Sequence, residues 1–140
     1  MDEATPPVPG RKKLVVVEDD EDTRELELFL LGSEGYHVVG LPDGEHAAET
    51  IAREAADLVI LDVMLPRKDG VQVLAELASQ PATADTPVIL VSAYLESPAV
   101  RKALATSRQV KRVFQKPFDL TQLFEAVSEE LASAEEVTET

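Results

Sequence analysis

The sequence lacks several features, and each absence removes a class of function. None of its 140 residues is cysteine, which excludes disulfide bonds, a thiolate nucleophile and a cysteine-ligated zinc ion. Two histidines are too few for a histidine-rich metal site. No apolar run approaches the roughly 18–20 residues of a membrane-spanning helix, and the opening MDEATPPVPG lacks the basic-then-apolar order of a signal peptide. We therefore expect a soluble, cytoplasmic protein with no membrane partner.

Basic residues are also scarce. Thirteen Lys and Arg stand against 27 Asp and Glu, which gives a formal net charge of −14. A field of that sign repels nucleic acid and favours cations and basic partner surfaces. Hydrophobic residues make up 44% of the chain, enough for the core of a single domain of this length.

Strand-like and helix-like segments alternate along the chain. Three fully apolar runs are typical of strands buried on both faces. Five strands are expected, at residues 14–17, 36–41, 58–61, 87–91 and 112–115. A helical segment follows each of them, which predicts an α/β fold with a doubly wound parallel sheet and helices on both faces. We place a disordered lead-in at 1–11, one domain at 12–132 and an acidic tail at 133–140.

Each helix should bury one apolar face. The expected inward residues are Leu26, Phe29 and Leu30 in the first helix; Ala47, Ala48, Ile51, Ala52 and Ala55 in the second; Val71, Leu74, Leu77 and Ala78 in the third; and Leu120, Leu123, Phe124, Val127 and Leu131 in the last. Pro98 suits the first turn of the fourth helix.

Chemically distinctive residues follow four of the five strands. Glu18 and Asp19 come after the first strand, Asp62 after the third, Ser92 after the fourth and Lys116 after the fifth. The carboxyl ends of parallel strands meet at one edge of the sheet, so we expect these side chains to lie together.

Such a group suggests phosphoryl chemistry at a metal. Clustered carboxylates repel one another unless they share a cation, and oxygen ligands suit Mg²⁺. A carboxylate beside that ion can attack phosphorus, while a lysine neutralises charge and a hydroxyl donates a hydrogen bond. Taken singly, each residue has a simpler explanation: a helix cap, a turn residue or a surface charge. Their shared edge favours the joint interpretation.

Four segments resemble the receiver domain of two-component response regulators. They are VVVEDDED, LVILDVMLPRKDG, VILVSA and QKPF, and the resemblance covers residues 12–132. It implies a flavodoxin-like, chemotaxis-receiver-like fold with strand order 2-1-3-4-5.

The resemblance also implies a role for each site residue. Asp62 is expected to be the phospho-acceptor, assisted by Ser92 and Lys116. Mg²⁺ is expected on Glu18, Asp19, Asp62 and the backbone carbonyl of Met64. A cis peptide bond is expected between Lys116 and Pro117.

The implied function is that of a single-domain receiver in a phosphorelay. The phosphoryl group would come from a histidine kinase or a histidine phosphotransfer protein. Phosphorylation would switch a surface formed by the fourth helix, the fifth strand and the fifth helix, which would bind a protein target or a second copy. Five cations, Arg101, Lys102, Arg108, Lys111 and Arg112, precede an acidic last helix there. No enzymatic activity is expected beyond self-dephosphorylation.

The sequence departs from the family pattern at two places. Val113 stands where the family usually has Tyr or Phe, and the neighbouring Phe114 should point to the opposite face of the sheet. The segment 107–109 replaces the usual Gly-Ala. These departures leave the acceptor chemistry in place but change the usual coupling to output.

Two other functions remain open at this point. One is a receiver-like interaction module that phosphate does not switch, which Val113 supports. The other is a phosphohydrolase with an aspartate nucleophile, but Met64 stands where such enzymes usually carry a second Asp. His37 and His46 lie away from the strand ends and are interpreted as structural or exposed.

Overall fold

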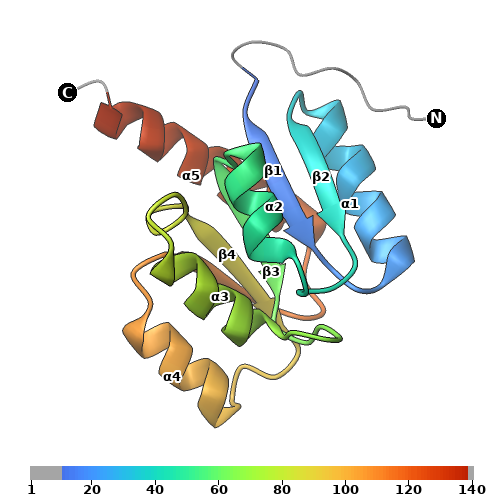
Figure 1. The fold of residues 1–140 in the computed structure, drawn as a ribbon. Helices are drawn as coiled ribbons and strands as arrows, with labels where there is room; N and C mark the ends of the chain where they lie inside the picture. The colour runs from blue at the N-terminus through green and yellow to red at the C-terminus, as the bar shows by residue number, and fades with distance from the viewer. Residues whose placement is uncertain (1–10, 139–140) are drawn as a thin grey trace.

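The computed structural model describes residues 11–138, with side chains through Ser133. The expected lead-in, apart from Arg11, and the last two residues of the expected tail lie outside this range. The strands are β1 Lys13–Val17, β2 His37–Leu41, β3 Leu58–Asp62, β4 Val88–Ser92 and β5 Val110–Gln115. The helices are α1 Glu21–Ser33, α2 Ala47–Glu54, α3 Gly70–Ser79, α4 Pro98–Thr106 and α5 Leu120–Thr138 (Figure 1).

The five strands form one parallel sheet in the order β2-β1-β3-β4-β5, as expected. Val17 of β1 is level with Leu61 of β3, and Leu61 is level with Leu90 of β4. The carboxyl ends of these strands therefore reach the same edge of the sheet.

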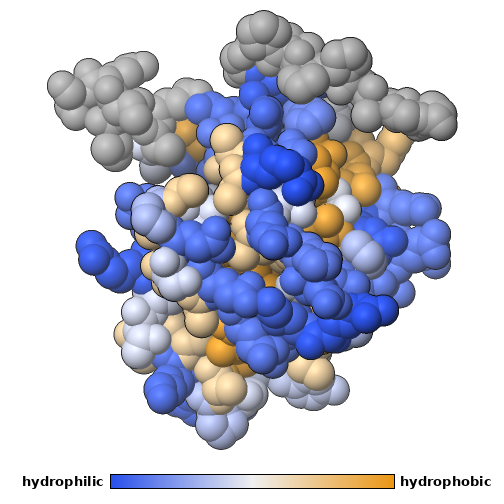
Figure 2. Space-filling view, in the orientation of Figure 1, coloured by the Kyte–Doolittle hydropathy of each residue, from blue (hydrophilic) through white to orange (hydrophobic). Residues whose placement is uncertain are grey.

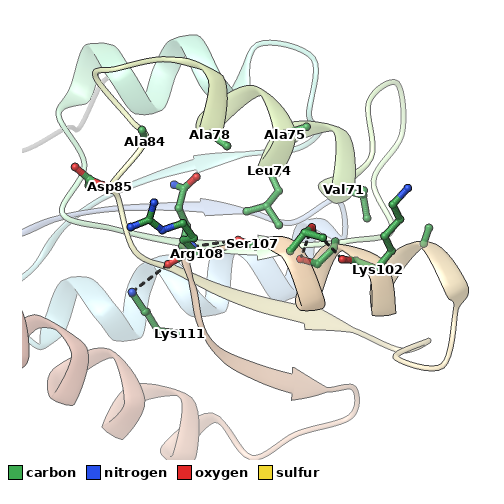
Figure 3. Close-up of a pocket in the computed structure, with 14 residues that line it drawn as sticks. Val71, Leu74, Ala75, Ala78, Ala84, Asp85, Lys102, Ser107, Arg108 and Lys111 are labelled. Atoms are coloured by element: carbon green, nitrogen blue, oxygen red, sulfur yellow. Dashed lines mark hydrogen bonds between the residues drawn. The ribbon is translucent and has the colours of Figure 1, made fainter.

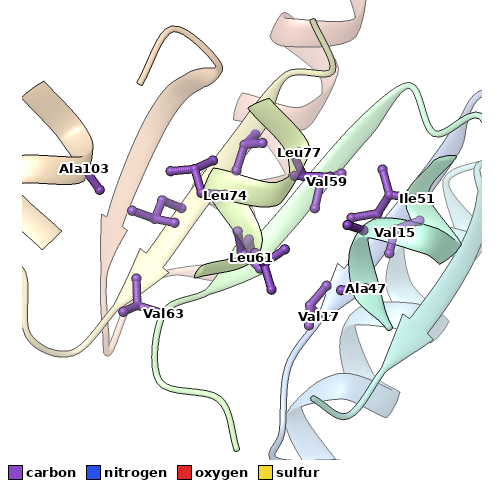
Figure 4. Close-up of a cluster of buried hydrophobic side chains, with 14 of the residues drawn as sticks. Val15, Val17, Ala47, Ile51, Val59, Leu61, Val63, Leu74, Leu77 and Ala103 are labelled. Carbon is purple, nitrogen blue, oxygen red and sulfur yellow. The ribbon is translucent and has the colours of Figure 1, made fainter. Parts of the chain in front are cut away.

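Alternate strand residues supply two separate cores, because successive side chains point to opposite faces of a sheet. Val15, Val17, Val59 and Leu61 pack beneath α2, α3 and α4 (Figure 4). The residues between them, such as Val16 and Ile60, pack with α1 and α5 on the other face. This two-sided burial explains why the strands carry uninterrupted apolar runs.

The expected inward face of α1 is wrong. The side chains of Leu26 and Phe29 are exposed, by 47% and 71%, whereas Glu27 and Leu31 are buried. Apolar residues occupy positions 26 and 28–31, so they cover most of the helix circumference and define no single stripe. Packing against the sheet decides which side turns inward.

Smaller differences affect three other helices. Ala55 and Ala78 are exposed, and Val73 of α3 is buried in place of Ala78. Ala55 adopts a left-handed conformation after α2, which takes it off the helix face. The last helix continues to Thr138, beyond the boundary expected at 132. The expected boundary followed the apolar period, which ends at Leu131, but helix-forming residues continue after it.

The surface over α2, α3 and α4 is mainly hydrophilic, with apolar side chains gathered over α3 and α4 (Figure 2). Within residues 11–138, no helix combines the length and the apolar character needed to cross a membrane.

Gly70 allows α3 to begin directly against the end of β3. A Cβ atom there would lie 2.5 Å from the carbonyl oxygen of Asp62 and 2.7 Å from Cα of Val63. Both are backbone atoms and cannot turn aside. The absence of a side chain at Gly70 therefore permits this close approach to the backbone of Asp62 and Val63.

We expect Gly70→Ala to destabilise the domain by about 1–3 kcal/mol, since the backbone must move to relieve the overlap. Gly32→Ala is the matched control, because a Cβ at Gly32 in α1 meets nothing within 4 Å. That control should gain about 0.5–1 kcal/mol from lower backbone entropy in the unfolded chain. Urea denaturation measures both, and equal stabilities for the two variants would contradict the close approach.

Candidate functional site

The carboxyl edge of the sheet brings together the side chains expected there. Glu18 follows β1, Asp62 and Ser92 are the last residues of β3 and β4, and Lys116 follows β5. Because β1, β3, β4 and β5 are neighbours in the sheet, these groups converge from segments as far as 98 residues apart.

The Lys116 ammonium links two of the carboxylates. Its Nζ donates to Oε1 of Glu18 at 3.0 Å and to Oδ2 of Asp62 at 2.5 Å. Glu18 and Asp62 are each only 3% exposed, so neither can rely on water for its charge. The backbone N–H of Lys116 also donates to the Ser92 carbonyl, and the bond to Pro117 is cis as expected.

Burial and hydrogen bonding act in opposite directions on these groups. Burial raises the pKa of Glu18, against the lowering effects of the Asp20 N–H and of Lys116. Burial alone would lower the pKa of Lys116, but its hydrogen bonds to Asp62 and Glu18 outweigh that effect and raise it. The lysine is therefore held as an ammonium.

One ammonium faces three carboxylates. Glu18, Asp19 and Asp62 each offer an oxygen, and these oxygens lie within 4.8 Å of one another. Lys116 neutralises only part of this charge, so a further cation would relieve the remaining repulsion. Oxygen donors, partly buried and partly open through the exposed Asp19, fit a hard divalent cation.

The other Asp62 oxygen is held by the following loop. The Met64 N–H donates to Oδ1 of Asp62 at 2.9 Å, while the Met64 side chain is exposed. This bond orients the carboxylate at the end of β3. The role expected for the Met64 carbonyl as a metal ligand stays a prediction.

Ser92 is buried beside the acidic group. Its Oγ accepts from the Tyr94 N–H at 2.9 Å, which leaves the hydroxyl proton to be donated. The next residue, Ala93, is small and exposed, so it does not cover the edge of the sheet.

Known sequences and structures resemble this arrangement. The sequence profile of the response regulator receiver domain matches residues 14–128. The chain belongs to the response regulator receiver family. The transcriptional regulatory protein PdtaR of Mycobacterium tuberculosis is 31% identical over 126 residues, which are 89% of this chain and 59% of PdtaR. The chain thus spans less than two thirds of that relative.

Solved receiver structures share the fold. The receiver domain of the Francisella response regulator 1452 is 26% identical, with a TM-score of 0.77 over 89% of this chain and 99% of that one. The receiver domain of sensor histidine kinase PA1611 from Pseudomonas aeruginosa PAO1 has the same TM-score at 23% identity, over 87% and 98%. That structure has a magnesium ion coordinated in its active site cleft.

Val113 and Phe114 of β5 lie on opposite faces of the sheet, as expected from the sequence. Val113 is 37% exposed, and the adjacent Phe114 packs on the opposite face of the sheet, where its ring lies 5.6 Å from that of Phe118. Phe114 is therefore a core residue and not a displaced aromatic switch. The histidines also fit expectation, since His37 opens β2 and exposed His46 lies 2.9 Å from Glu49.

Two residues near the site were not anticipated from the sequence. Arg24 of α1 donates to the carbonyl of Glu18 at 2.9 Å and so holds the loop that carries the acidic pair. Glu27, one turn further along α1, is only 2% exposed and makes no hydrogen bond within the described part of the chain. The sequence signal that could have indicated the burial of Glu27 is its position between Leu26 and Leu28, inside an apolar helical run.

Burial, with a smaller contribution from the charge of Glu18, raises the pKa of Glu27 to about 7 from 4.5. The folded state then holds a proton that the unfolded chain has released. The free energy of unfolding should therefore fall as pH rises from about 4.5 to about 7, and level off above that.

We expect Glu27→Gln to remove this fall, so that in metal-free buffer the variant gains roughly 3 kcal/mol over wild type between pH 4 and pH 8. Glu25→Gln is the control, because Glu25 lies exposed on the same helix. Urea denaturation at both pH values measures the difference. Parallel pH profiles for wild type and Glu27→Gln would contradict the burial of a titrating carboxyl.

Proposed function

We propose that this receiver accepts a phosphoryl group on Asp62 from a phosphohistidine. An oxygen of the Asp62 carboxylate attacks phosphorus, the P–N bond breaks, and the imidazole of the donor leaves with the electron pair. The donor is a histidine kinase or a histidine phosphotransfer protein. The observation that carries the proposal is a buried carboxylate at the end of β3, held beside an ammonium and two further acids.

The residues of the site fit a Mg²⁺ ion. Glu18, Asp19 and Asp62 would hold it, and the ion would supply positive charge that reduces repulsion between the carboxylate and the incoming phosphoryl oxygens. The magnesium-bound receiver domain of similar fold supports this choice of cation.

Lys116 and Ser92 would respond to the acyl phosphate. The phosphoryl group adds roughly −1.5 to −2 charge at neutral pH, which gives the Lys116 ammonium a stronger partner than the carboxylate alone. The Ser92 hydroxyl can donate to a phosphoryl oxygen if Oγ moves from its place over the Tyr94 N–H. Both shifts start at the ends of β4 and β5, which lead into α4 and α5.

We propose that the switched surface is formed by α4, β5 and α5, and that it binds a protein target or a second copy. Arg112 is already paired there with Glu129 and Glu130 of α5, at 2.7 and 2.8 Å. The proposed role of the chain is that of a phospho-acceptor in the cytoplasm, with no turnover other than the loss of its own phosphate.

We expect Asp62→Asn to abolish phosphorylation, because the amide cannot attack phosphorus to form an acyl phosphate. The full chain is incubated with acetyl phosphate and Mg²⁺, and the mass increase of one phosphate is measured. Asp57→Asn is the matched control: Asp57 lies just before β3, and its Oδ2 accepts from the Lys13 N–H, which an amide oxygen can also do. A wild type that gains no phosphate would instead favour the phosphate-independent interaction module.

We expect Asp19→Asn to weaken Mg²⁺ binding by at least about tenfold, since the site loses one of few charged ligands. Asp20→Asn is the neighbouring control, because Asp20 caps α1 by accepting from the Thr23 N–H and asparagine caps equally well. Calorimetric titration of Mg²⁺ measures both. Equal loss in the two variants would mean that the ion responds to the acidic loop in general and that Asp19 is no ligand.

A further inference from the structure

A cavity lies between α3 and α4, beside the start of β5. It has a volume of about 660 Å³ and is bounded by α3, α4 and the loop from α4 into β5 (Figure 3). That volume is within the range of roughly 300–1,000 Å³ found for small-molecule sites. Nothing in the phosphorylation chemistry uses it.

The walls are apolar and lined with small side chains. Leu74, Ala75 and Ala78 face it from α3, and Ala103 from α4. Ala78 is exposed, contrary to the expectation that it packs inside, so α3 and α4 do not close on each other at this level. The result is an apolar hollow instead of a filled helix interface.

Gln109 supplies a polar group with an unmet hydrogen bond. Its Nε2 donates to the carbonyls of Thr83 and Thr86, both at 2.9 Å, while the side-chain oxygen Oε1 is buried and has no partner. Two carbonyl acceptors require the NH₂ group on their side, so the amide cannot be turned to exchange the two ends. A buried acceptor without a donor loses the hydrogen bonds that water would give it in the unfolded chain, and so opposes folding.

Gln109 also lines the cavity and belongs to the segment that departs from the family pattern. Oε1 is closed to solvent, so a ligand must displace the side chains that cover it. The Arg108 and Lys111 side chains beside it also line the cavity, and both are long and exposed. An N–H or O–H donor that reaches Oε1 would satisfy the missing bond.

The rim of the cavity carries excess positive charge in a strongly acidic chain. Lys102, Arg108 and Lys111 line it, against the single carboxylate of Asp85. Within the described residues these three cations have no ion-pair partner, whereas Arg101 is paired with Glu96. A shift in the pairing of β4 with β5 passes over Lys111, and such an irregularity re-aims side chains.

We propose that this cavity binds a small organic anion with an apolar body and an N–H or O–H donor. The apolar walls take the body, the cationic rim takes the anionic group and Gln109 takes the donor. A small molecule is favoured over a protein segment because a few polar groups converge on one apolar hollow of ligand size. The site is independent of the acceptor chemistry at Asp62.

The probe is 8-anilinonaphthalene-1-sulfonate, which combines an aromatic body, a sulfonate and one N–H. It is titrated by fluorescence into the full, unphosphorylated chain. Saturable binding is expected, with amide NMR shifts confined to α3, α4 and residues 107–111. Ala78→Trp should weaken binding by at least about tenfold by filling the hollow, and Lys102→Glu by about fivefold or more by reversing a rim charge.

Arg101→Glu is the matched control, because it makes the same charge change on the adjacent residue of α4 but does not line the cavity. Its affinity for the probe should stay within about twofold of wild type. Equal affinities for wild type, Ala78→Trp and Lys102→Glu, or no saturable binding to wild type, would overturn the site. An N-methylated probe that binds as tightly as the parent would overturn the role of Gln109.

Ala78 and Lys102 are exposed helix positions. The thermal melting temperatures of Ala78→Trp and Lys102→Glu should therefore match that of wild type, which verifies that both variants fold. Phosphorylation by acetyl phosphate should also be unchanged in them. A failure of probe binding is thereby separated from a failure of the proposed phospho-acceptor function.

Discussion

The contact of one ammonium with two buried carboxylates is the interaction on which the site depends. Glu18 and Asp62 are brought together by strand pairing, whatever the electrostatic cost, because their strands are fixed by apolar packing below them. Lys116 reaches them from the far end of the chain and offsets part of that cost. The remaining negative charge attracts a cation, which the proposed chemistry requires. The same charge lowers the stability of the fold through repulsion between the carboxylates.

The features that sequence predicts well are those set by local pattern. Runs such as Val15 to Val17 and Leu58 to Leu61 are typical of strands buried on both faces. Three such runs, with two further strand-like segments and helices between them, leave little choice of architecture. The site residues follow, because strand ends meet at one edge. Glu18, Asp62, Ser92 and Lys116 were therefore predicted together, although the hydrogen-bond partners of each were not.

The features that sequence predicts poorly are those that depend on which side of a helix packs against the sheet. In α1 the apolar residues surround the helix, so Leu26 and Phe29 are as hydrophobic as Leu31 but lie outside. Glu27 lies inside because it shares a face with Leu31, one turn away, and local propensity carries no information about that choice. Gln109 is similar: its two bonds to the loop of Thr83 and Thr86 join segments that are distant in sequence.

Glu27 and Gln109 have a common physical property. Both residues are almost fully buried and lie on opposite sides of the sheet. Oε1 of Gln109 is a buried acceptor without a donor, whereas the Glu27 carboxyl makes no hydrogen bond to the described residues and lines a pocket. Glu27 faces the pocket that Lys116 also lines, and Gln109 faces the cavity between α3 and α4. Apolar residues would fill either position at lower cost, so packing alone does not account for them. Buried polar groups that oppose stability mark places where a fold serves binding or regulation, and here they flank the acceptor site and the helix that follows β4.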